Sequence, residues 1–272
     1  MASDGEHEAE NWMLSGKTAL VTGSTGTIGY AVARKLAERG CSVMVHGTGD
    51  REEIDARCAA MRREYGTAVC YSDADIASPE GVRALVQQTE DELGAIDILV
   101  NAAAIQYVAP LEEFPLERLR AILDVNLLAS IVATQLVIPG MKLRRWGRII
   151  NFASTNGLVS SPFKVPYSVS KHGIVGLTKG TALELGEYGV TCNALAPGFV
   201  DTPMFREPSS DLARREGVNV EAFMERLVRQ KHVIPRLISP MELAAAVLFY
   251  CSDDAAAITG TVLPIDAGWT AH

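Results

Sequence analysis

The sequence predicts a single α/β domain of the doubly wound type, in which a parallel sheet of seven strands is covered by helices on both faces. Short apolar runs rich in β-branched residues alternate along the chain with longer segments of helical periodicity, which is the pattern of such a sheet. The 272 residues are 48% apolar, enough to bury a large core. No Pro- or Ser-rich linker divides them, so one large domain is expected.

The expected strands are apolar runs that end at polar or glycine-containing turns. In chain order they span residues 18–22, 42–46, 68–73, 96–101, 148–153, 190–196 and 261–265. Because a helix separates each strand from the next, the strands are expected to be parallel, with their carboxyl ends at one edge of the sheet.

The expected helices occupy the segments between the strands. They span residues 28–39, 51–65, 79–93, 116–137, 166–188 and 240–251. The first ends at Gly40, and glycine readily adopts the left-handed conformation that often terminates a helix. Ser78 and Ser239 each precede a proline, which is typical of an N-cap followed by the first helical turn.

Residues 197–238 break this alternation. Four prolines (Pro197, Pro203, Pro208 and Pro235) surround short helical stretches at 211–216 and 220–230. A connection this long within a compact domain is usually functional, so we expect a helical lid over a substrate site. Residues 1–13 are expected to form a disordered acidic lead, which leaves the domain itself to residues 14–272.

Charge and hydropathy argue against two classes of partner. The chain has 25 Lys and Arg against 33 Asp and Glu, a formal net charge of -8, and no basic run that could follow a nucleic-acid backbone. Polar residues and a proline interrupt the longest apolar stretch, 127–141, which falls short of the ~18 residues of a membrane span. A soluble protein is therefore expected.

Cysteine usage and the first residues indicate a cytoplasmic protein. The five cysteines are scattered, without a Cys-x-x-Cys pair or a histidine at metal-ligand spacing, so buried thiols in a reducing compartment are expected. Residues 1–11 carry four acids, no basic residue and no apolar core, a composition that fits neither a secretory signal nor a transit peptide.

A glycine-rich turn joins the first strand to the first helix. It reads Thr22-Gly-Ser-Thr-Gly-Thr-Ile-Gly29. Glycines here let the backbone approach a pyrophosphate, and the free N–H groups and dipole of the helix favour the anion. The motif follows the first strand of an alternating chain, which is the position of a dinucleotide site.

Three other polar or proline-containing segments follow strands. Asp75 follows the third strand, residues 101–104 the fourth and residues 197–202 the sixth. Ligands of open α/β sheets bind at the carboxyl ends of the strands, so these segments are expected to line the same cleft. The alternative for each alone is an ordinary cap or turn.

Ser154, Tyr167 and Lys171 form a candidate catalytic set. Ser154 ends the fifth strand, and the four-residue spacing of Tyr167 and Lys171 places both on one face of the next helix. An ammonium beside a phenol favours the phenolate, so we expect Lys171 to lower the pKa of Tyr167. Tyr167 would then exchange a proton with a substrate alcohol or ketone whose oxygen Ser154 holds.

With these motifs the chain resembles the short-chain dehydrogenase/reductase family, from about residue 14 to the last residue. The resemblance is carried by Thr22-Gly-x-x-Gly-x-x-Gly29, Asn101-Ala-Ala-Ala104, Asn126, Ser154, Tyr167-x-x-x-Lys171 and Pro197-Gly-x-x-x-Thr202. It implies a Rossmann-type fold, NAD or NADP as cofactor, chemistry without a metal, and a homotetramer or homodimer.

The resemblance also implies roles for individual residues. Tyr167 is the acid/base, and Ser154 orients the reacting oxygen. Lys171 binds the nicotinamide ribose, and Asn126 holds a water of the proton relay. The residues implied to contact the cofactor are Gly23, Thr25, Thr27, Ile28, Gly29, Asp75, Ile76, Asn101, Ala103, Tyr167, Lys171, Pro197, Val200 and Thr202, with Asp75 at the adenine and Thr202 at the carboxamide.

Two segments depart from the family pattern. The usual turn is Thr-Gly-x-x-x-Gly-x-Gly, whereas here the middle glycine is Gly26 and a β-branched Thr27 follows it. The usual Asn-Asn-Ala-Gly is Asn101-Ala102-Ala103-Ala104 here, which removes an amide that braces neighbouring strands.

Within the family the chain resembles the D-3-hydroxybutyrate dehydrogenases more closely. This resemblance rests on residues 46–50, Ile105-Gln106, residues 157–160, Lys164, residues 171–179 and residues 268–271. In that group a small carboxylate is held by a Gln after the fourth strand, a His two residues after the catalytic Ser, a Lys before the Tyr and a Gln in the lid.

Half of this carboxylate site is retained. Gln106 and Lys164 match two of its positions, Asn156 stands where the His is expected, and the lid Gln is replaced around Pro208. Trp269 matches a residue that lines the pocket. The implied substrate site is Gln106, Ser154, Asn156, Lys164, Tyr167 and Trp269, and the implied substrate is a small 3-hydroxy acid such as 3-hydroxybutyrate or a relative. The alternative is that Lys164 is a solvated surface lysine, Gln106 a turn residue and Trp269 a packing aromatic.

The predicted cofactor is NAD. No acid ends the second strand, and no Arg or Lys lies in the glycine turn to meet a 2′-phosphate. NAD is favoured mainly by the resemblance of the loop at residues 46–50, although Arg51 keeps NADP open as an alternative. His172 is turned about 100° from Lys171 on the helix and is expected to be structural. His46 has no assigned role.

Three rival functions use the same residues differently. An NADPH-dependent reductase of 3-oxoacyl thioesters would be expected to have a basic cofactor loop. A polyol or sugar dehydrogenase would not need Lys164. A dinucleotide-binding regulator without turnover would have little reason to keep Asn126, Ser154, Tyr167 and Lys171 together.

Overall fold

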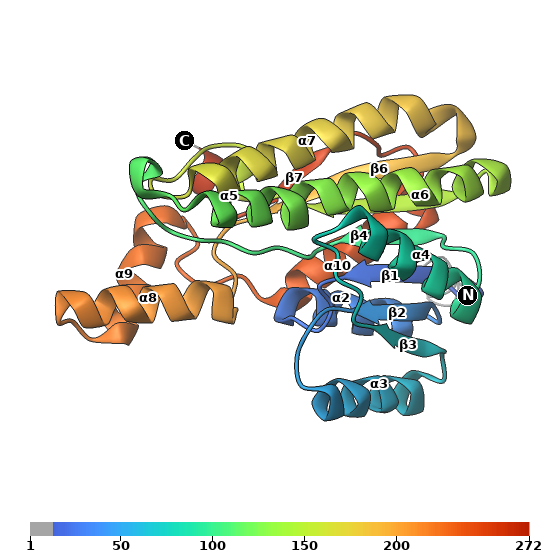
Figure 1. Ribbon diagram of the computed structural model, residues 1–272, viewed down its shortest axis with the longest axis horizontal. Coiled ribbons are helices and arrows are strands. Elements are labelled where there is room, and N and C mark those ends of the chain that lie inside the picture. Colours follow the sequence, from blue (N-terminus) through green and yellow to red (C-terminus); the bar gives the residue numbers. More distant parts are fainter. Residues whose placement is uncertain (1–12, 272) are drawn as a thin grey trace, which may run out of the picture.

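The computed structural model describes residues 13–271, so the expected acidic lead lies, except for its last residue, outside the described residues. The strands are β1 Thr18–Thr22, β2 Ser42–His46, β3 Val69–Ser72, β4 Ile98–Asn101, β5 Gly147–Phe152, β6 Val190–Pro197 and β7 Val262–Ile265. They form one parallel sheet in the order β3-β2-β1-β4-β5-β6-β7 (Figure 1). The predicted seven-stranded doubly wound sheet is confirmed, and its winding direction reverses between β1 and β4.

Helices cover both faces of the sheet, except for the two within residues 203–231, which lie away from it (Figure 1). The helices are α2 Thr27–Glu38, α3 Arg51–Tyr65, α4 Pro79–Leu93, α5 Leu116–Leu123, α6 Ala129–Arg144, α7 Val165–Leu185, α8 Pro203–Glu216, α9 Val220–Lys231 and α10 Pro240–Cys251. Ala19 and Val21 pack toward α2 and α10, whereas Leu20 between them packs toward α4 and α6. Successive strand residues therefore fill two separate cores.

Two helices differ from their predicted bounds by more than three residues. The helix expected at residues 116–137 runs on to Arg144, contains a π-helical turn at Asp124–Leu128 and passes through Pro139. Pro139 is exposed, so the carbonyl that loses its helical partner there faces solvent. The helix expected at residues 211–216 begins at Pro203 instead, because Pro203 occupies a first-turn position where proline is tolerated.

The continuous segment Leu116–Arg144 is long and apolar enough to cross a membrane by length and composition, although sequence reading judged its apolar stretch too short. Val132, Val137 and Met141 on this segment are buried in the core beneath α4. Packing on the sheet thus accounts for the buried part of this segment, which is 44% of its most apolar window.

All five cysteines are free thiols, as sequence reading expected. Cys41, Cys58, Cys192 and Cys251 are buried, and Cys70 is half-buried. Burial raises the pKa of each thiol, that of Cys192 and Cys251 to about 12.

One hydroxyl group connects the end of β1 to the segment that follows β4. Thr22 Oγ1 accepts hydrogen bonds from the backbone N–H groups of Ala102 at 3.1 Å and Ala103 at 3.2 Å. Next to it, Asn101 donates to Asn151 Oδ1 on β5 at 2.8 Å. These bonds brace the segment after β4, where the family's second asparagine is missing.

Candidate active site

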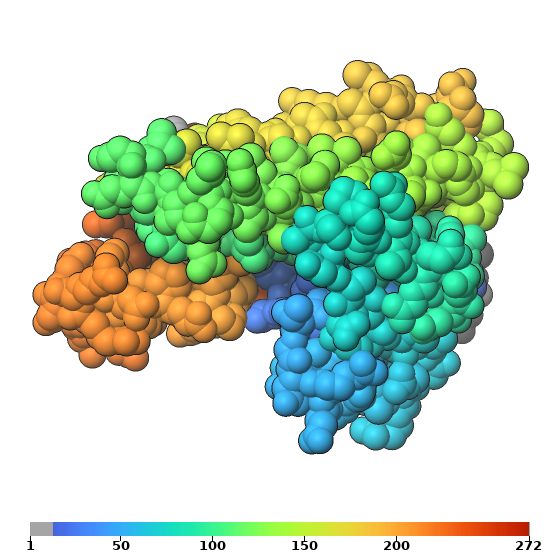
Figure 2. Space-filling model, in the orientation of Figure 1, coloured from blue at the N-terminus to red at the C-terminus, as the bar shows by residue number. Residues whose placement is uncertain are grey.

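A cavity of about 590 Å³ lies at the carboxyl ends of the strands. In Figure 2 the surface is hollowed between the orange helices of the predicted lid, α8 and α9, and the blue N-terminal segments. Nearly every residue proposed for the site lines this cavity: Gly23, Thr25, Thr27, Ile28, Gly29, Asp75, Ile76, Ala103, Gln106, Ser154, Asn156, Lys164, Tyr167, Lys171, Pro197, Val200, Thr202 and Trp269. Asn101 and Asn126 do not.

The glycine turn has no room for side chains at two positions. Gly23 has a φ of +69°, and a Cβ atom there would lie 2.7 Å from the Cα of Ala103. A Cβ on Gly29 would lie 2.5 Å from the oxygen of Gly23. Gly26 has an extended backbone and Thr27 begins α2, so the shifted glycine pattern needs no left-handed residue after Gly23 in this turn.

His46, which had no assigned role, braces this turn. Its Nδ1 accepts a hydrogen bond from the backbone N–H of Gly23 at 3.3 Å, so Nε2 carries the hydrogen and donates to the oxygen of Ala74 at 2.9 Å. Burial lowers the pKa of His46, although Asp73 and Asp75 nearby act in the opposite direction. The neutral imidazole thus links the ends of β1, β2 and β3.

Tyr167 and Lys171 lie one turn apart on α7, beside Ser154 at the end of β5. Burial raises the pKa of Tyr167, and a hydrogen bond with Ser154 partly opposes the rise. Burial also lowers the pKa of Lys171 to about 8. Lys171 Nζ donates to the oxygen of Phe152 at 2.7 Å and lies 5.6 Å from the centroid of the Tyr167 ring.

The expected lowering of the Tyr167 pKa by Lys171 was therefore wrong in direction. Both side chains are removed from water, and the cost of burying a phenolate outweighs the attraction of an ammonium that already binds a carbonyl. The phenol keeps its proton near neutral pH.

Asn126 lies in the π-helical turn and holds the segment after β4. Its Oδ1 accepts from the backbone N–H of Ile105 at 2.8 Å, and its Nδ2 donates to the oxygen of the same residue at 2.9 Å. π-Helical turns are frequent at functional sites because they redirect a side chain out of the helical register. In this structure Asn126 positions a wall of the cavity.

The substrate end of the cavity contains Lys164, Asn156, Gln106 and Trp269. Burial lowers the pKa of Lys164, and this lysine has no ion-pair partner within residues 13–271. Lys164 therefore lies on the cavity wall rather than on an open surface. The side-chain oxygen of Asn156 is buried without a hydrogen bond among these described residues.

Trp269 was predicted to line the pocket, but the two phenylalanines that form an aromatic group with it, Phe199 and Phe205, were not. Phe199 lies 4.7 Å from Trp269 and 4.8 Å from Phe205, measured between ring centroids. All three line the cavity. Buried His232 accepts from the backbone N–H of Phe199 at 3.0 Å and donates to the oxygen of Arg236 at 2.8 Å. The signal for the two phenylalanines was the run of prolines around them.

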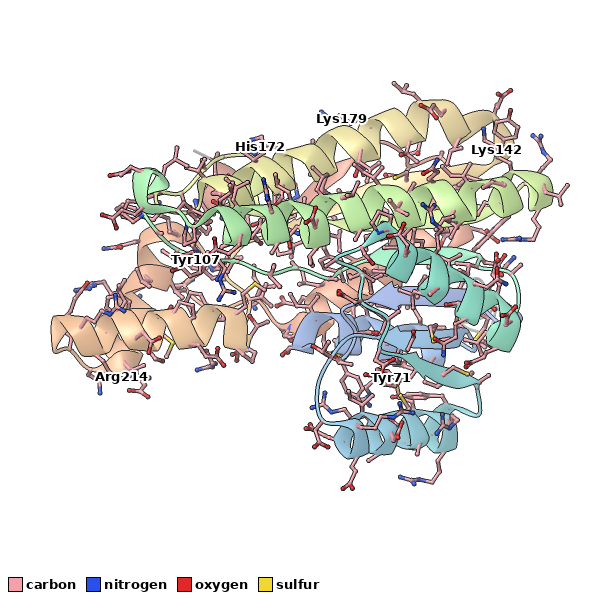
Figure 3. All side chains as sticks on the ribbon, in the orientation of Figure 1. Tyr71, Tyr107, Lys142, His172, Lys179 and Arg214 are labelled. Carbon is pink, nitrogen blue, oxygen red and sulfur yellow. The ribbon has the colours of Figure 1, made fainter. Side chains whose placement is uncertain are left out.

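His172 is exposed on the outer side of α7, near Lys179 in Figure 3. Its Nδ1 is 2.9 Å from the oxygen of Ser168 on the preceding turn, and the residue does not line the cavity. This position is compatible with the structural role expected for it.

The family model of the short chain dehydrogenases matches residues 17–213. The chain belongs to this family, whose members are oxidoreductases with a nicotinamide cofactor. The resemblance drawn from the motifs is confirmed.

The chain is similar over nearly its whole length to named members of the family. It is 43% identical to D-beta-hydroxybutyrate dehydrogenase from Cupriavidus necator, over 96% of this chain and 100% of that protein. It is 41% identical to the protein of the same name from Rhizobium meliloti, over 94% of this chain and 99% of that protein. L-sorbose reductase from Gluconobacter frateurii, solved with NADPH and L-sorbose, matches with a TM-score of 0.90 at 27% identity, over 95% of this chain and 98% of that chain.

The His46 brace predicts a loss of stability in mild acid. A protonated imidazole would direct Nδ1–H at the N–H of Gly23, so the folded state binds this proton less readily than the unfolded chain, where the pKa is about 6.5. The contribution of His46 to the free energy of unfolding is present above the pKa of the unfolded chain and is lost as pH falls through the lower pKa of the folded state. We expect the urea midpoint of the native protein to fall between about pH 7.5 and about pH 5.5 by more than that of His46→Gln, whose amide can make both bonds. Equal falls in the two proteins would contradict the role of His46.

Proposed function

We propose that the protein is an NAD-linked dehydrogenase of a small 3-hydroxy acid, with 3-hydroxybutyrate as the representative substrate. The proposal is carried by Lys164, a largely buried cation without an acidic partner in the described chain, on the wall that also holds Ser154 and Tyr167. A buried ammonium is costly unless an anion pairs with it. The D-beta-hydroxybutyrate dehydrogenases similar to this chain support the same substrate class.

The cavity fits a nicotinamide dinucleotide. At Gly23 and Gly29 the backbone leaves no room for a Cβ atom, so main-chain N–H groups at the start of α2 can approach a pyrophosphate. The cavity continues from this turn past Thr202 to Tyr167. The nicotinamide supplies the hydride acceptor or donor when it is bound.

NAD rather than NADP is favoured by the charges at the β2–β3 end of the cavity. Asp73 and Asp75 line this end and would repel a 2′-phosphate. Arg51, the cation that kept NADP open, donates to Asp55 at 2.8 Å, lies over the ring of Tyr71 and does not line the cavity. Rates at equal concentrations of NAD and NADP test this choice, and faster turnover with NADP would overturn it.

The chain's own residues would move one proton and fix the substrate oxygen. Ser154 and Tyr167 share a hydrogen bond and can bind the same oxygen of an alcohol or ketone. Tyr167, protonated near neutral pH, donates its proton when the ketone is reduced. When the alcohol is oxidised, Tyr167 accepts the hydroxyl proton as the phenolate, so the phenol must first release its own proton to solvent. Lys171 carries positive charge below about pH 8, close to the phenol, and stabilises the phenolate that forms during reduction.

Asn126 acts on this geometry through the backbone of Ile105, which it holds with two hydrogen bonds. Lys164 would pair with the substrate carboxylate and set the distance from it to the reacting carbon. That pairing would also restore charge balance at the buried ammonium.

We also propose that the protein acts in the cytoplasm as a homotetramer. The free cysteines favour a reducing compartment. Apolar side chains such as Ile131 on α6 and Val169 and Leu183 on α7 are exposed and would be covered by further copies. The molar mass from light scattering tests the assembly, and a monomer at micromolar concentration would contradict it.

Removing the Tyr167 hydroxyl should abolish proton transfer without disturbing the cofactor site. We expect Tyr167→Phe to lower kcat by roughly 10²- to 10⁴-fold, because that is what a positioned acid/base contributes. The Kd of the cofactor, measured by fluorescence titration, should stay within about twofold of the native value. Tyr188→Phe, far from the cavity, is the matched control. Near-native turnover in Tyr167→Phe would overturn the mechanism.

Removing the charge of Lys164 should weaken the binding of acids selectively. We expect Lys164→Met to raise KM for 3-hydroxybutyrate by roughly 10- to 100-fold, the equivalent of one charge-assisted hydrogen bond. The KM for a neutral secondary alcohol of similar size should not change. Lys179→Met, on the exposed side of α7, serves as the control. An equal effect on the acid and the alcohol would contradict carboxylate binding and would favour a polyol or sugar substrate.

A further inference from the structure

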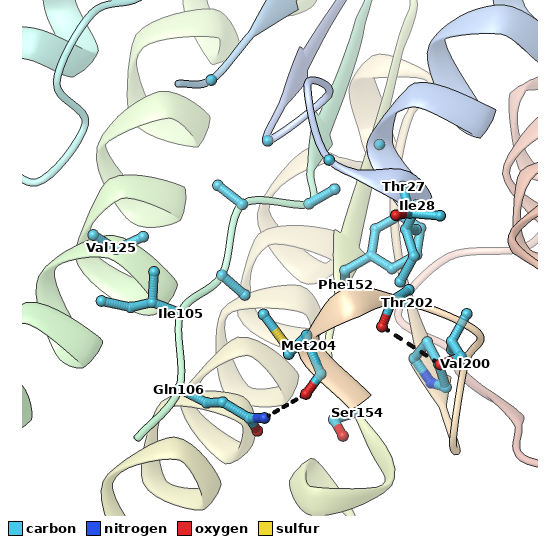
Figure 4. Close-up of a pocket in the computed structure, with 18 of the residues that line it drawn as sticks. Thr27, Ile28, Ile105, Gln106, Val125, Phe152, Ser154, Val200, Thr202 and Met204 are labelled. Carbon is cyan, nitrogen blue, oxygen red and sulfur yellow. Dashed lines mark hydrogen bonds between the residues drawn. The ribbon is translucent and has the colours of Figure 1, made fainter. Parts of the chain in front are cut away.

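One side-chain hydrogen bond connects the sheet to the lid above the substrate end of the cavity. Gln106, in the segment after β4, donates from Nε2 to the backbone oxygen of Met204, in the first turn of α8, at 3.0 Å. The two residues are 98 positions apart in the sequence and both line the cavity. Figure 4 shows this bond crossing from one wall to the other.

The Met204 carbonyl is available to Gln106 because of a proline. In an α-helix the oxygen of residue 204 accepts from the N–H of residue 208. Residue 208 is Pro208, which has no N–H and whose ring crowds the carbonyl four residues earlier. Gln106 thus supplies the donor that the helix lacks.

Packing does not explain this proline. Pro208 is exposed, and the residues of α8 that are buried are Ser209 and Ala213. The next carbonyl, that of Phe205, has its ordinary helical donor because residue 209 is not a proline. The Ser209 hydroxyl also donates to this oxygen at 2.7 Å. Since α8 has few buried residues, the hydrogen bond from Gln106 adds to a small set of contacts that hold this helix over the cavity, among them the Phe205–Phe199 ring contact and the packing against α9.

We propose that Gln106, Met204 and Pro208 form a latch that holds α8 over the substrate end of the cavity. Gln106 is the positioning residue, and Pro208 keeps the Met204 carbonyl open to it. The second N–H and the oxygen of the Gln106 amide have no partner within residues 13–271, so the same side chain can contact a substrate while it holds the lid. This last coupling rests on the proposed function, whereas the latch itself does not.

Four proteins test the latch: native, Gln106→Ala, Pro208→Ala and the double variant. Hydrogen exchange in the absence of substrate is measured for α8 and for residues 105–109. In Gln106→Ala we expect both segments to exchange roughly three- to tenfold faster, the equivalent of one net hydrogen bond. KM for a 3-hydroxy acid should rise with little change in kcat.

Pro208→Ala distinguishes the latch from a merely structural role of Gln106, because the latch predicts opposite changes in the two segments. The new N–H can bond to Met204, so we expect α8 to exchange more slowly while residues 105–109 exchange faster and KM rises. Adding Gln106→Ala to Pro208→Ala should then change exchange by less than about twofold, because the carbonyl already has a helical donor.

Two control variants make comparable changes away from the latch. Pro139→Ala restores an N–H inside α6 at an exposed position, and Gln230→Ala removes an exposed glutamine of α9. Neither should alter exchange in residues 105–109.

Unchanged exchange of both segments in Gln106→Ala would overturn the latch. Unchanged exchange of residues 105–109 in Pro208→Ala would overturn the part given to Pro208. A raised KM in Gln106→Ala without any change in exchange would mean that Gln106 acts on substrate alone, which would leave the proposed function standing. If no 3-hydroxy acid is turned over, the proposed function fails and the exchange rates still decide the latch.

Discussion

The cofactor cleft depends on the close approach of two backbone segments, one after β1 and the other after β4. Only a residue without a side chain fits at Gly23, because Ala103 lies against it. The Thr22 hydroxyl accepts from two N–H groups of the segment after β4, so a side chain of the sheet itself sets the distance between the two segments. His46 continues the same bracing to β3. The glycine turn can therefore meet a charged ligand without any rearrangement of the strands beneath it.

Strands and most helices could be predicted because their signals are local. Alternating apolar runs and serine–proline starts depend on a few neighbouring residues, and the catalytic set was found from its spacing on one helix. The π-helical turn around Asn126 could not, since the position of Asn126 depends on its hydrogen bonds to a distant segment. The early start of α8 was missed although Pro203 is a local first-turn signal. The direction of the Tyr167 pKa also depends on burial, which no spacing reveals. Likewise, His46 and Gln106 gained their structural partners only in the folded chain.

The cavity is divided by charge although the whole protein is acidic. Its β2–β3 end carries Asp73 and Asp75, and its other end carries Lys164 and Lys171. Local cations in a partly buried site outweigh a diffuse surface charge of -8, which salt screens. The net charge therefore says little about the substrate, and the arrangement of these four side chains gives the cavity a polarity.

The His232 imidazole connects the two ends of the long segment between β6 and α10, which was predicted to be a lid. One of its nitrogens binds the chain where this segment leaves the sheet, at Phe199, and the other binds the chain near its far end, at Arg236. A Cβ atom on Gly198 would lie 2.8 Å from this ring, so the glycine keeps the site open for it. The ring acts as a non-covalent cross-link between the two ends of the loop, and much of the entropy cost of closing that loop is met before any ligand arrives. The helices α8 and α9 then move as parts of a loop whose two ends are held together, rather than as parts of a chain with free ends.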